Sequence, residues 1–567
     1  MTRLAEREGE AIRTVSEAPP SHPTVARLIV RCLENEGVEY VFGVPGEENI
    51  HLVDALHDSR IRFIVVRDER GAAFMADTYG RLTGKAGVCL ATLGPGALNL
   101  TLGTANAQLD SHPLVALVAQ AGLDRLYKES HQVVDLVGVY RPITRWAATL
   151  TRPESAAEMV RKAFKRAPAE RPGATLLAVP EDVAPLEVST EPLPVRQPVD
   201  AAPSPRQVAR AVELLNAARA PVVLAGAEAS RDHCSAALVR FAERLHLPVA
   251  TTFLGKGVFP DGHANALGTL GFMRHDYANF GFDQADLVIT VGYDLVEYPP
   301  ARWCPNRDKK VLHLHRTMAE VDASYPVAVG IESNLAEALD AIAAQAEPKR
   351  SLPAAVARAR GLLAEEIERG RRDTSFPVKP QRLVADIRAA LGESDVVLCD
   401  TGAVKMWMAR LYPCYQPETC LVSNGLATMG FALPGAIAAK LARPQCKVLA
   451  AVGDGAFLMN AQELETALRE RVPFVVLIWL DDAYGLIKWK MDLELDRHSA
   501  VDFSNPDFVK YAESFGAQGY RIEAAADLLP TLKKALADDT VSVIVCPVDY
   551  SENMKLTEKL GQLTEAL

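Results

Sequence analysis

Apolar runs that recur along the whole chain, with helix-like segments between them, limit the fold more than any other feature of the sequence. Examples are "IRFIVV", "ADLVITVG" and "FVVLIWL". Strands that are apolar along their whole length are buried on both faces, as in parallel sheets covered by helices on each side. The pattern therefore predicts an α/β fold of doubly wound parallel sheets. In such sheets, ligands bind beyond the carboxyl ends of the strands.

The apolar runs fall into three blocks, and 567 residues are too many for one ordinary core. A Pro-rich stretch at 189–205 separates the first two blocks, and a charged stretch separates the second from the third. We predict three domains at 23–188, 206–346 and 379–550, a linker at 347–378, a mobile N-terminal tail at 1–22 and a C-terminal tail at 551–567.

The composition argues against several classes of protein. The net charge of −11 disfavours nucleic acid as the main partner, and nine cysteines without a CxxC pair disfavour a structural zinc site or a disulfide framework. The N-terminus has no apolar signal core, and the most apolar run is too short to span a bilayer. We therefore expect a cytoplasmic protein with neither a nucleic-acid nor a membrane partner.

A carboxylate between two glycines ends one buried strand of the third block. The strand "KVLAAV" leads into Gly453, Asp454 and Gly455, and the next strand ends just before Asp481. If the two strands are neighbours, both carboxylates lie at one sheet edge and repel each other unless a cation binds between them. Mg²⁺ prefers such oxygen ligands, and the glycines let backbone N–H groups approach a diphosphate. The structural alternative is a turn residue at 454 and a helix N-cap at 481.

The stretch "GDGAFLMNAQELETALRERVPFVVLIWLDDAYG" resembles the thiamine diphosphate motif of the pyruvate-type carboligases and decarboxylases. The resemblance implies thiamine diphosphate as cofactor, and Mg²⁺ held by Asp454, Asp481 and the backbone carbonyl of Ala483. Most members have Asn at the second position, whereas Asp is typical of the FAD-independent, catabolic acetolactate synthases. The resemblance also implies further cofactor contacts from Ala403, Val404, Gly453, Gly455, Ala456, Tyr484, Gly485 and Leu486.

Thiamine diphosphate also needs a carboxyl group beside its pyrimidine ring, in an apolar pocket where the carboxyl can share a proton. The segment "IRFIVVRDERGAAFMADTYGRLTG" resembles the family pattern of strand, glutamate and Gly-Ala-Ala helix, which implies that Glu69 is the catalytic glutamate. The alternative is a first-turn glutamate favoured by the helix dipole. The loops "VFGVPGEEN" and "ATLGPGALNL" also resemble the family's first domain and imply pyrimidine contacts from Pro45, Gly46, Gly94 and Asn99.

A third stretch that resembles the family is "VSNGLATMGFALPGAIAAKLA", residues 422–442. It implies that Met429 is the bulky side chain that bends the cofactor, and that the carbonyl of Ala427 accepts a hydrogen bond from the aminopyrimidine. A methionine in an apolar helix is otherwise ordinary core packing. In this family Glu69 and Asp454 meet across a subunit interface, so the resemblance implies a homodimer with shared active sites that pairs into a homotetramer.

Besides Asp481, two stretches resemble the catabolic acetolactate synthases in particular. "KESHQVVDLVGVYRPITRWA" resembles a segment that faces the reaction centre, which implies Gln132 and His131 near thiazolium C2; a lone histidine is equally compatible with a structural role. "ADLVITVGYDLVEYPPARW" lacks the Arg-Phe-Asp-Asp-Arg run of FAD-binding relatives, so no FAD is expected. Lys490 stands where relatives have Gln or Trp. It would hold the carboxylate of the second substrate, select another acceptor, or remain a solvated lysine.

The resemblance covers nearly the whole chain and makes the three domains the pyrimidine-binding, central and diphosphate-binding domains. It implies an acetolactate synthase, which decarboxylates pyruvate on thiamine diphosphate and condenses the hydroxyethyl carbanion with a second pyruvate to give 2-acetolactate and CO₂. One alternative is a related carboligase or decarboxylase using another 2-keto acid or an aldehyde acceptor. Another is a nucleotide-binding protein with a simple Mg²⁺-phosphate site, which leaves Glu69 and Met429 without a role. The last is a catalytically inactive relative.

Overall fold

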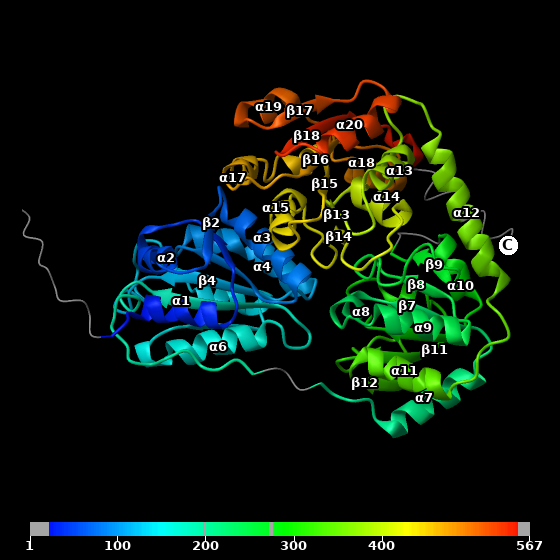
Figure 1. The fold of residues 1–567 in the computed structure, drawn as a ribbon, viewed down its shortest axis with the longest axis horizontal. Helices are drawn as coiled ribbons and strands as arrows, with labels where there is room; N and C mark the ends of the chain where they lie inside the picture. Colours follow the sequence, from blue (N-terminus) through cyan, green and yellow to red (C-terminus); the bar gives the residue numbers. More distant parts are fainter. Residues whose placement is uncertain (1–21, 197–199, 272–275, 554–567) are drawn as a thin grey trace, which may run out of the picture.

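The chain folds into three β-sheets that follow one another along the sequence (Figure 1). The computed structural model describes residues 22–196, 200–271 and 276–553. Each sheet has six strands, and all pairs of neighbouring strands in it are parallel. Helices interleave with the strands, so the predicted fold class, α/β with three parallel-sheet domains, is confirmed.

The first sheet has the strand order β2-β1-β3-β4-β6-β5. Its strands are β1 Tyr40–Gly43, β2 Arg62–Val65, β3 Gly87–Ala91, β4 Leu114–Gln120, β5 Trp146–Thr149 and β6 Ala174–Pro180. Its helices are α1 Val25–Asn35, α2 Ile50–His57, α3 Glu69–Thr83, α4 Pro95–Leu109, α5 Leu136–Tyr140 and α6 Ala156–Arg166. The inner strands β3, β4 and β6 are buried at every residue, as strands covered on both faces must be.

The second sheet has the order β12-β11-β10-β7-β8-β9. Its strands are β7 Pro221–Ala225, β8 Val249–Thr251, β9 Ala266–Thr269, β10 Leu287–Val291, β11 Lys310–His315 and β12 Val327–Glu332. Its helices are α7 Pro205–Ala217, α8 Ala227–Arg231, α9 Ser235–Leu245, α10 Phe280–Asp283 and α11 Leu335–Gln345. The stretch predicted as a charged linker contains an 18-residue helix, α12 Ala354–Arg371, which runs along the outer side of the second and third sheets (Figure 1).

The third sheet has the order β14-β13-β15-β16-β18-β17. Its strands are β13 Val396–Cys399, β14 Cys420–Val422, β15 Val448–Gly453, β16 Val475–Leu480, β17 Gln518–Arg521 and β18 Ser542–Pro547. Its helices are α13 Pro380–Ala390, α14 Ala403–Leu411, α15 Ala432–Ala442, α16 Asp454–Phe457, α17 Glu463–Arg469, α18 Gly485–Leu495, α19 Phe508–Phe515 and α20 Leu528–Ala535. The order of the inner strands places β15 directly beside β16, where the carboxylate pair was expected.

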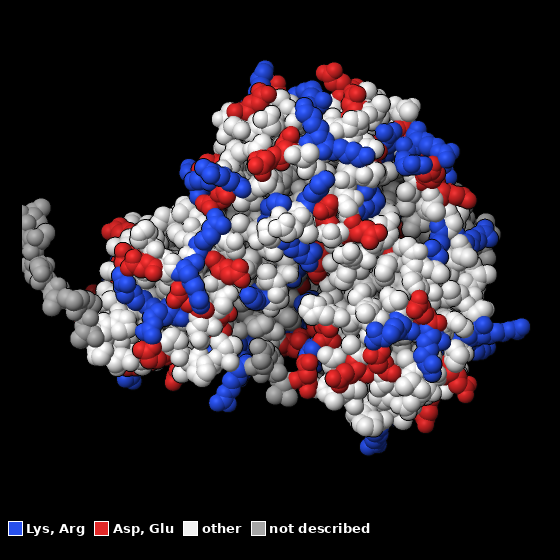
Figure 2. Space-filling model, viewed as in Figure 1, with Lys and Arg blue, Asp and Glu red and all other residues white. Residues whose placement is uncertain are grey.

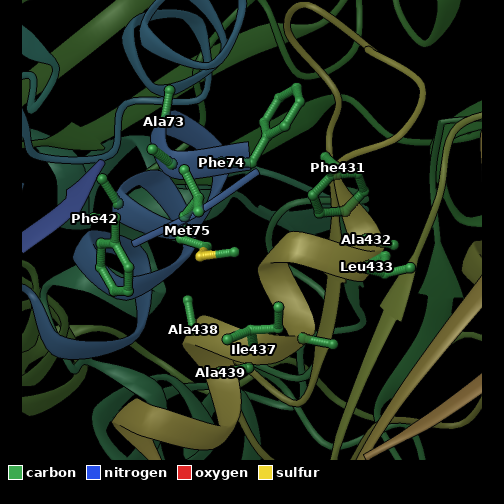
Figure 3. Packing of buried hydrophobic residues seen from close by; sticks show 14 of the residues in the cluster. Phe42, Ala73, Phe74, Met75, Phe431, Ala432, Leu433, Ile437, Ala438 and Ala439 are labelled. Atoms are coloured by element: carbon green, nitrogen blue, oxygen red, sulfur yellow. The ribbon is translucent and has the colours of Figure 1, made fainter. Parts of the chain in front are cut away.

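The first and third domains share one hydrophobic core, built around α3 and α15 (Figure 3). Phe74 and Met75 of α3 are fully buried in the same cluster as Phe431 and Ile437. Small residues let the two helices approach closely: a Cβ on Gly435 of α15 would lie 2.8 Å from Oγ1 of Thr78. Because apolar burial of this kind is the main stabilising contribution, the two domains are held in a fixed relation within one chain.

Charged side chains are distributed over the molecule without a dominant sign on the face that Figure 2 shows. Within the described part of the chain, no helix combines the length and the apolar character that a membrane span requires. The expected N-terminal tail lies outside the described residues except for His22, and most of the expected C-terminal tail lies outside them as well.

Candidate active site

The Gly-Asp-Gly turn and the next acidic strand end lie at the same edge of the third sheet. β15 pairs with β16 in parallel, with Gly453 opposite Trp479. The strands therefore deliver Asp454 and Asp481 to the same carboxyl edge, and the predicted juxtaposition of the two is confirmed. Asp454 is the first residue of the short helix α16, whose N-cap is Gly453.

Asp454 is almost fully buried and held by backbone N–H groups. Its carboxylate accepts hydrogen bonds from the amides of Gly455 at 2.8 Å and Asp482 at 2.7 Å. The side-chain amide of Asn505 donates to it at 2.8 Å. Asn505 also donates to Asp482 at 2.7 Å and was not identified from the sequence. Burial raises the pKa of Asp454, while these hydrogen bonds lower it.

The carboxylate of Asp481 has fewer hydrogen-bond donors around it than that of Asp454, and its pKa is shifted further. Burial raises the pKa of its carboxyl to about 8, and the negative charge of Asp454 adds to the effect. The two carboxyl groups lie close together, and hydrogen bonds offset their negative charge only in part. Such a pair of oxygen donors is suited to a hard divalent cation. No cluster of three or more His, Cys, Asp or Glu forms a metal site within the described residues. The third predicted ligand, the backbone carbonyl of Ala483, is a neutral oxygen and is not among the residue types of such a cluster.

Several residues predicted to contact the cofactor lie at the carboxyl ends of the strands of this sheet. A Cβ on Gly455 would lie 3.0 Å from the ring of Tyr484. A glycine at 455 avoids this close contact, so the ring can lie against the turn. A Cβ on Gly485 would lie 2.5 Å from the Asp481 carboxylate, which places that carboxylate against the first turn of α18. Ala456 is buried behind the turn, and Leu486 follows in α18. Ala403 and Val404 begin α14 at the carboxyl end of β13, after the positive-φ Gly402.

On the first domain, Glu69 is the first residue of α3, which Asp68 caps. The side-chain amide of Asn99 donates to Oε2 of Glu69 at 3.0 Å. The other oxygen, Oε1, faces the first turn of α4, where a Cβ on Gly96 would lie 3.0 Å from it. The structure thus brings together two of the predicted pyrimidine-side residues, Glu69 and Asn99.

Three further predicted residues line the same strand ends. The Pro45–Gly46 turn packs on Thr92, since a Cβ on Gly46 would lie 2.5 Å from that side chain. Gly94 has a positive φ of 56°, and a Cβ there would lie 2.9 Å from the backbone carbonyl oxygen of Gln132.

The side chains of Gln132 and of its neighbour His131 are exposed in the single chain. Gln132 itself has a positive φ of 58°. The structure therefore places Gln132 beside the Gly94 loop, with the exposed His131 preceding it in the chain.

The loop that carries Ala427 and Met429 precedes α15, so Met429 lies in a turn rather than in the apolar helix expected from the sequence. Ala427 has a positive φ of 52°, and Met429 is half-buried. The buried carboxylate of Asp400 fixes the loop by accepting from the amides of Gly430 at 2.8 Å and Ala432 at 2.9 Å. Burial raises the pKa of Asp400 to about 6.

Lys490 is exposed on α18, two residues beyond Lys488, which pairs with Asp502 at 2.8 Å. Within the described residues, no hydrogen bond or ion pair joins Glu69 to Asp454, Asp481 or Lys490. One chain thus presents two groups of predicted site residues, one on the first sheet and one on the third.

Three family models match the chain, one within each of the three sheet-containing regions. They are the N-terminal thiamine pyrophosphate (thiamine diphosphate) binding domain, the central domain and the C-terminal thiamine pyrophosphate binding domain of the thiamine pyrophosphate enzymes. The residues matched are 23–139, 208–342 and 400–546. The first and third models cover the two groups of predicted site residues.

Curated relatives match along nearly the whole chain. An acetolactate synthase of Bacillus subtilis is 35% identical over 555 residues, 96% of this chain and 97% of that protein. A catabolic acetolactate synthase of Raoultella terrigena is 36% identical, over 95% of this chain and 97% of its own length. A probable acetolactate synthase large subunit of Methanocaldococcus jannaschii is 34% identical, over 95% and 94%. The chain belongs to the thiamine diphosphate-dependent acetolactate synthase family.

Proposed function

We propose that this protein condenses two molecules of pyruvate to 2-acetolactate with release of CO₂, using thiamine diphosphate and Mg²⁺. The observation that supports this proposal most directly is that Asp454 and Asp481 lie together at one sheet edge, with the pKa of Asp481 raised to about 8. These two carboxylates would hold Mg²⁺, which would neutralise their repulsion and supply positive charge for a diphosphate. The names of the full-length relatives point to the same activity.

Thiamine diphosphate, when bound, supplies the electron sink for the loss of CO₂ from a 2-keto acid. The residues of this chain hold and orient the reactants. Glu69 would share a proton with a nitrogen of the pyrimidine ring, and Asn99 fixes the orientation of the carboxyl through its bond to Oε2. Gln132 and Lys490 would face the keto acids, with the Lys490 ammonium attracting the carboxylate of the acceptor.

Glu297 supports the expectation that the central domain holds no FAD. Its buried carboxylate accepts from the amide of Ala227 at 3.0 Å and from that of Asp294 at 2.9 Å. Ala227 follows β7, at the carboxyl edge where doubly wound sheets bind the phosphates of nucleotides. A carboxylate of the chain itself therefore occupies the anion position at this edge, and burial raises its pKa to about 7.

A second copy of the chain would complete the site. Leu98 and Leu102 flank Asn99 on α4 and are 41% and 37% exposed. Beside the Gly-Asp-Gly turn, Tyr484 and Ile487 are 41% and 51% exposed. Glu69 can share a proton with the pyrimidine only where an apolar surface covers its carboxyl. Across a dimer, these exposed apolar residues of one chain would cover the site residues of the other. We propose a homodimer with two shared sites, pairing further into a tetramer.

The test is a product assay with the purified protein, pyruvate, thiamine diphosphate and Mg²⁺. We expect one 2-acetolactate and one CO₂ for each pair of pyruvates consumed, and an absorption spectrum without flavin bands. Free acetaldehyde as the main product would instead identify a decarboxylase. Product only when an aldehyde or another 2-keto acid is added would identify a carboligase with a different acceptor. Glu69→Gln is expected to remove turnover while the protein stays folded.

A further inference from the structure

A buried glutamate of the third domain holds the turn of the first domain that carries Glu69. Glu463 begins α17, and its side chain is fully buried. Oε1 accepts hydrogen bonds from the backbone amides of Arg67 at 3.1 Å and Asp68 at 3.1 Å. These two residues join β2 to α3 directly before Glu69. A side chain of one domain thus fixes the backbone from which the carboxyl of another domain projects.

The carboxylate of Glu463 packs closely against the first turn of α3. A Cβ on Gly71, in the first turn of α3, would lie 2.8 Å from Oε1 of Glu463. The hydroxyl of Thr466 donates to Oε2 at 2.6 Å, so both oxygens are engaged. A glutamate here therefore sits against the N-terminal turn of α3, where an anion is favoured by the free amides and the helix dipole.

Two further contacts join the end of α17 to β2, one at each end of the strand. Arg62 pairs with Glu470 at 3.0 Å, and the guanidinium of Arg469 bonds the carbonyl of Val65. These contacts are exposed, whereas Glu463 is desolvated, and burial raises the pKa of its carboxyl to about 7. Burying a carboxyl group costs folding free energy unless the group is hydrogen-bonded. The backbone amides of Arg67 and Asp68 therefore stabilise Glu463 in its buried position.

We propose that Glu463 is a positioning residue for Glu69. It holds the Arg67–Asp68 backbone so that α3 begins at a fixed place and Glu69 reaches the amide of Asn99. This proposal rests on the proposed function, because the consequence of misplacing Glu69 is slower activation of thiamine diphosphate. It requires no contact between Glu463 and the cofactor.

The first test needs no cofactor. In the ligand-free protein, Glu463→Ala is expected to speed amide hydrogen exchange in the peptide that contains residues 66–72, because two amides lose their acceptor. Glu463→Gln keeps an acceptor oxygen and is expected to restore slow exchange. The matched control is Glu465→Ala, on the same helix, whose carboxylate faces Arg469 at 3.0 Å and not α3. Equal exchange in Glu463→Ala and Glu465→Ala would overturn the proposal.

The second test follows exchange of the C2 proton of enzyme-bound thiamine diphosphate by quenched-flow NMR. Glu463→Ala is expected to slow it by about 10- to 100-fold, the usual cost of a displaced catalytic group. In the Glu69→Gln background the same change should add nothing, because Glu463 acts through Glu69. Additive losses would contradict the proposal.

If Glu463→Ala does not fold, Glu463→Asp replaces it. The shortened side chain keeps the charge but withdraws from the amides, so C2 exchange should still fall, and wild-type exchange in this variant would overturn the proposal. Failure of the wild-type protein itself to exchange C2 or to form acetolactate would instead refute the proposed function. A normal wild type with an unaffected Glu463→Ala variant would refute only the role of Glu463.

Discussion

The two acids of the proposed metal pair differ in the groups that surround each carboxylate. Asp454 is bound by the amides of Gly455 and Asp482 and by Asn505, so its carboxylate is stabilised before any cation arrives. Asp481 lies beside that charge with a pKa raised to about 8. Asp454 therefore organises the turn, while Asp481 is the acid whose charge the proposed cation would stabilise.

This difference predicts unequal effects of two similar substitutions. Asp454→Asn turns an amide NH₂ toward N–H donors, so thiamine diphosphate with Mg²⁺ should no longer raise the melting temperature. Asp481→Asn removes the repulsion and keeps an oxygen ligand, so it should retain a clear stabilisation by the cofactor. Thermal shift with and without a chelator of Mg²⁺ measures both. A stabilised Asp454→Asn variant would contradict the assignment.

Lys490 offers a test of substrate binding. If its ammonium holds the acceptor carboxylate, Lys490→Gln should raise KM for pyruvate about tenfold with a smaller change in kcat, and added salt should weaken the wild type in the same direction. The control is Lys510→Gln, an exposed lysine of the same domain that pairs with Asp507 at 3.5 Å. Unchanged KM would make Lys490 a solvated surface residue.

The candidate site could be predicted from the sequence where its residues form local motifs. Glu69, Asp454 and Asp481 each follow the end of a strand. The order of the strands in the third sheet then places Asp454 and Asp481 at the same edge. Asn505 and Glu463 could not be found in this way. Asn505 reaches Asp454 across 51 positions, and Glu463 binds amides some 395 positions away, so their roles depend on tertiary contacts.

Among the helices, the separation of α3 and α4 sets the contact between Glu69 and Asn99. The two helices pack at Gly103 of α4, where a Cβ would lie 2.5 Å from Cβ of Ala73 and 2.8 Å from its backbone carbon. Backbone atoms cannot rotate away as a flexible side chain does. The site geometry therefore depends on a glycine that lies outside every motif.

Gly103→Ala should push α4 away from α3. Overpacking of this kind costs about 1–3 kcal/mol, which is partly offset by about 1 kcal/mol from the better helix propensity of alanine. We expect a lower melting temperature and a lower kcat, because Asn99 moves with α4. Gly361→Ala in α12 is the control, since its Cβ would meet nothing within 4 Å. A stable and fully active Gly103→Ala variant would contradict this view of the helix pair.

The strands predicted from the sequence are mainly those of the sheet interiors, because continuous burial leaves a continuous apolar run. Several edge strands gave no such signal. β5 is half-buried throughout, β12 alternates between half-buried and buried residues with an exposed residue at each end, and β17 has no fully buried residue. Edge strands face solvent on one side, so their pattern resembles that of loops. The domain limits stay predictions.

Across the molecule, buried acids give the ligand-free protein a particular pH dependence. Burial raises the pKa of Glu297 and Glu463 to about 7, and that of Asp481 to about 8. A carboxyl with a raised pKa binds more protons in the folded chain than in the unfolded chain, so rising pH favours unfolding. His313 acts in the opposite direction, since burial lowers its pKa to about 4 and stability rises until the unfolded histidine is neutral.

The rise in stability that His313 causes ends at about pH 6.5, where the unfolded histidine becomes neutral. Above that pH only the buried acids titrate in this account, so the free energy of unfolding should fall between about pH 6.5 and 8. Denaturant unfolding of the ligand-free protein across this range measures the slope. Glu297→Gln removes one of the titrating groups and should flatten it. A stability that rises over the same range, or an unchanged slope in the variant, would show that these acids titrate normally.

In the proposed dimer, Glu69 of one chain and the Asp454 turn of the other form one acetolactate-producing site. Glu69→Gln and Asp454→Ala are each expected to be inactive alone. When the two variants are unfolded and refolded together, half of the dimers are mixed, and one of the two sites in each mixed dimer carries both native residues. Acetolactate formation from pyruvate should then return to about a quarter of the wild-type rate. A refolded mixture that contains dimers but forms no acetolactate would rule out the shared site.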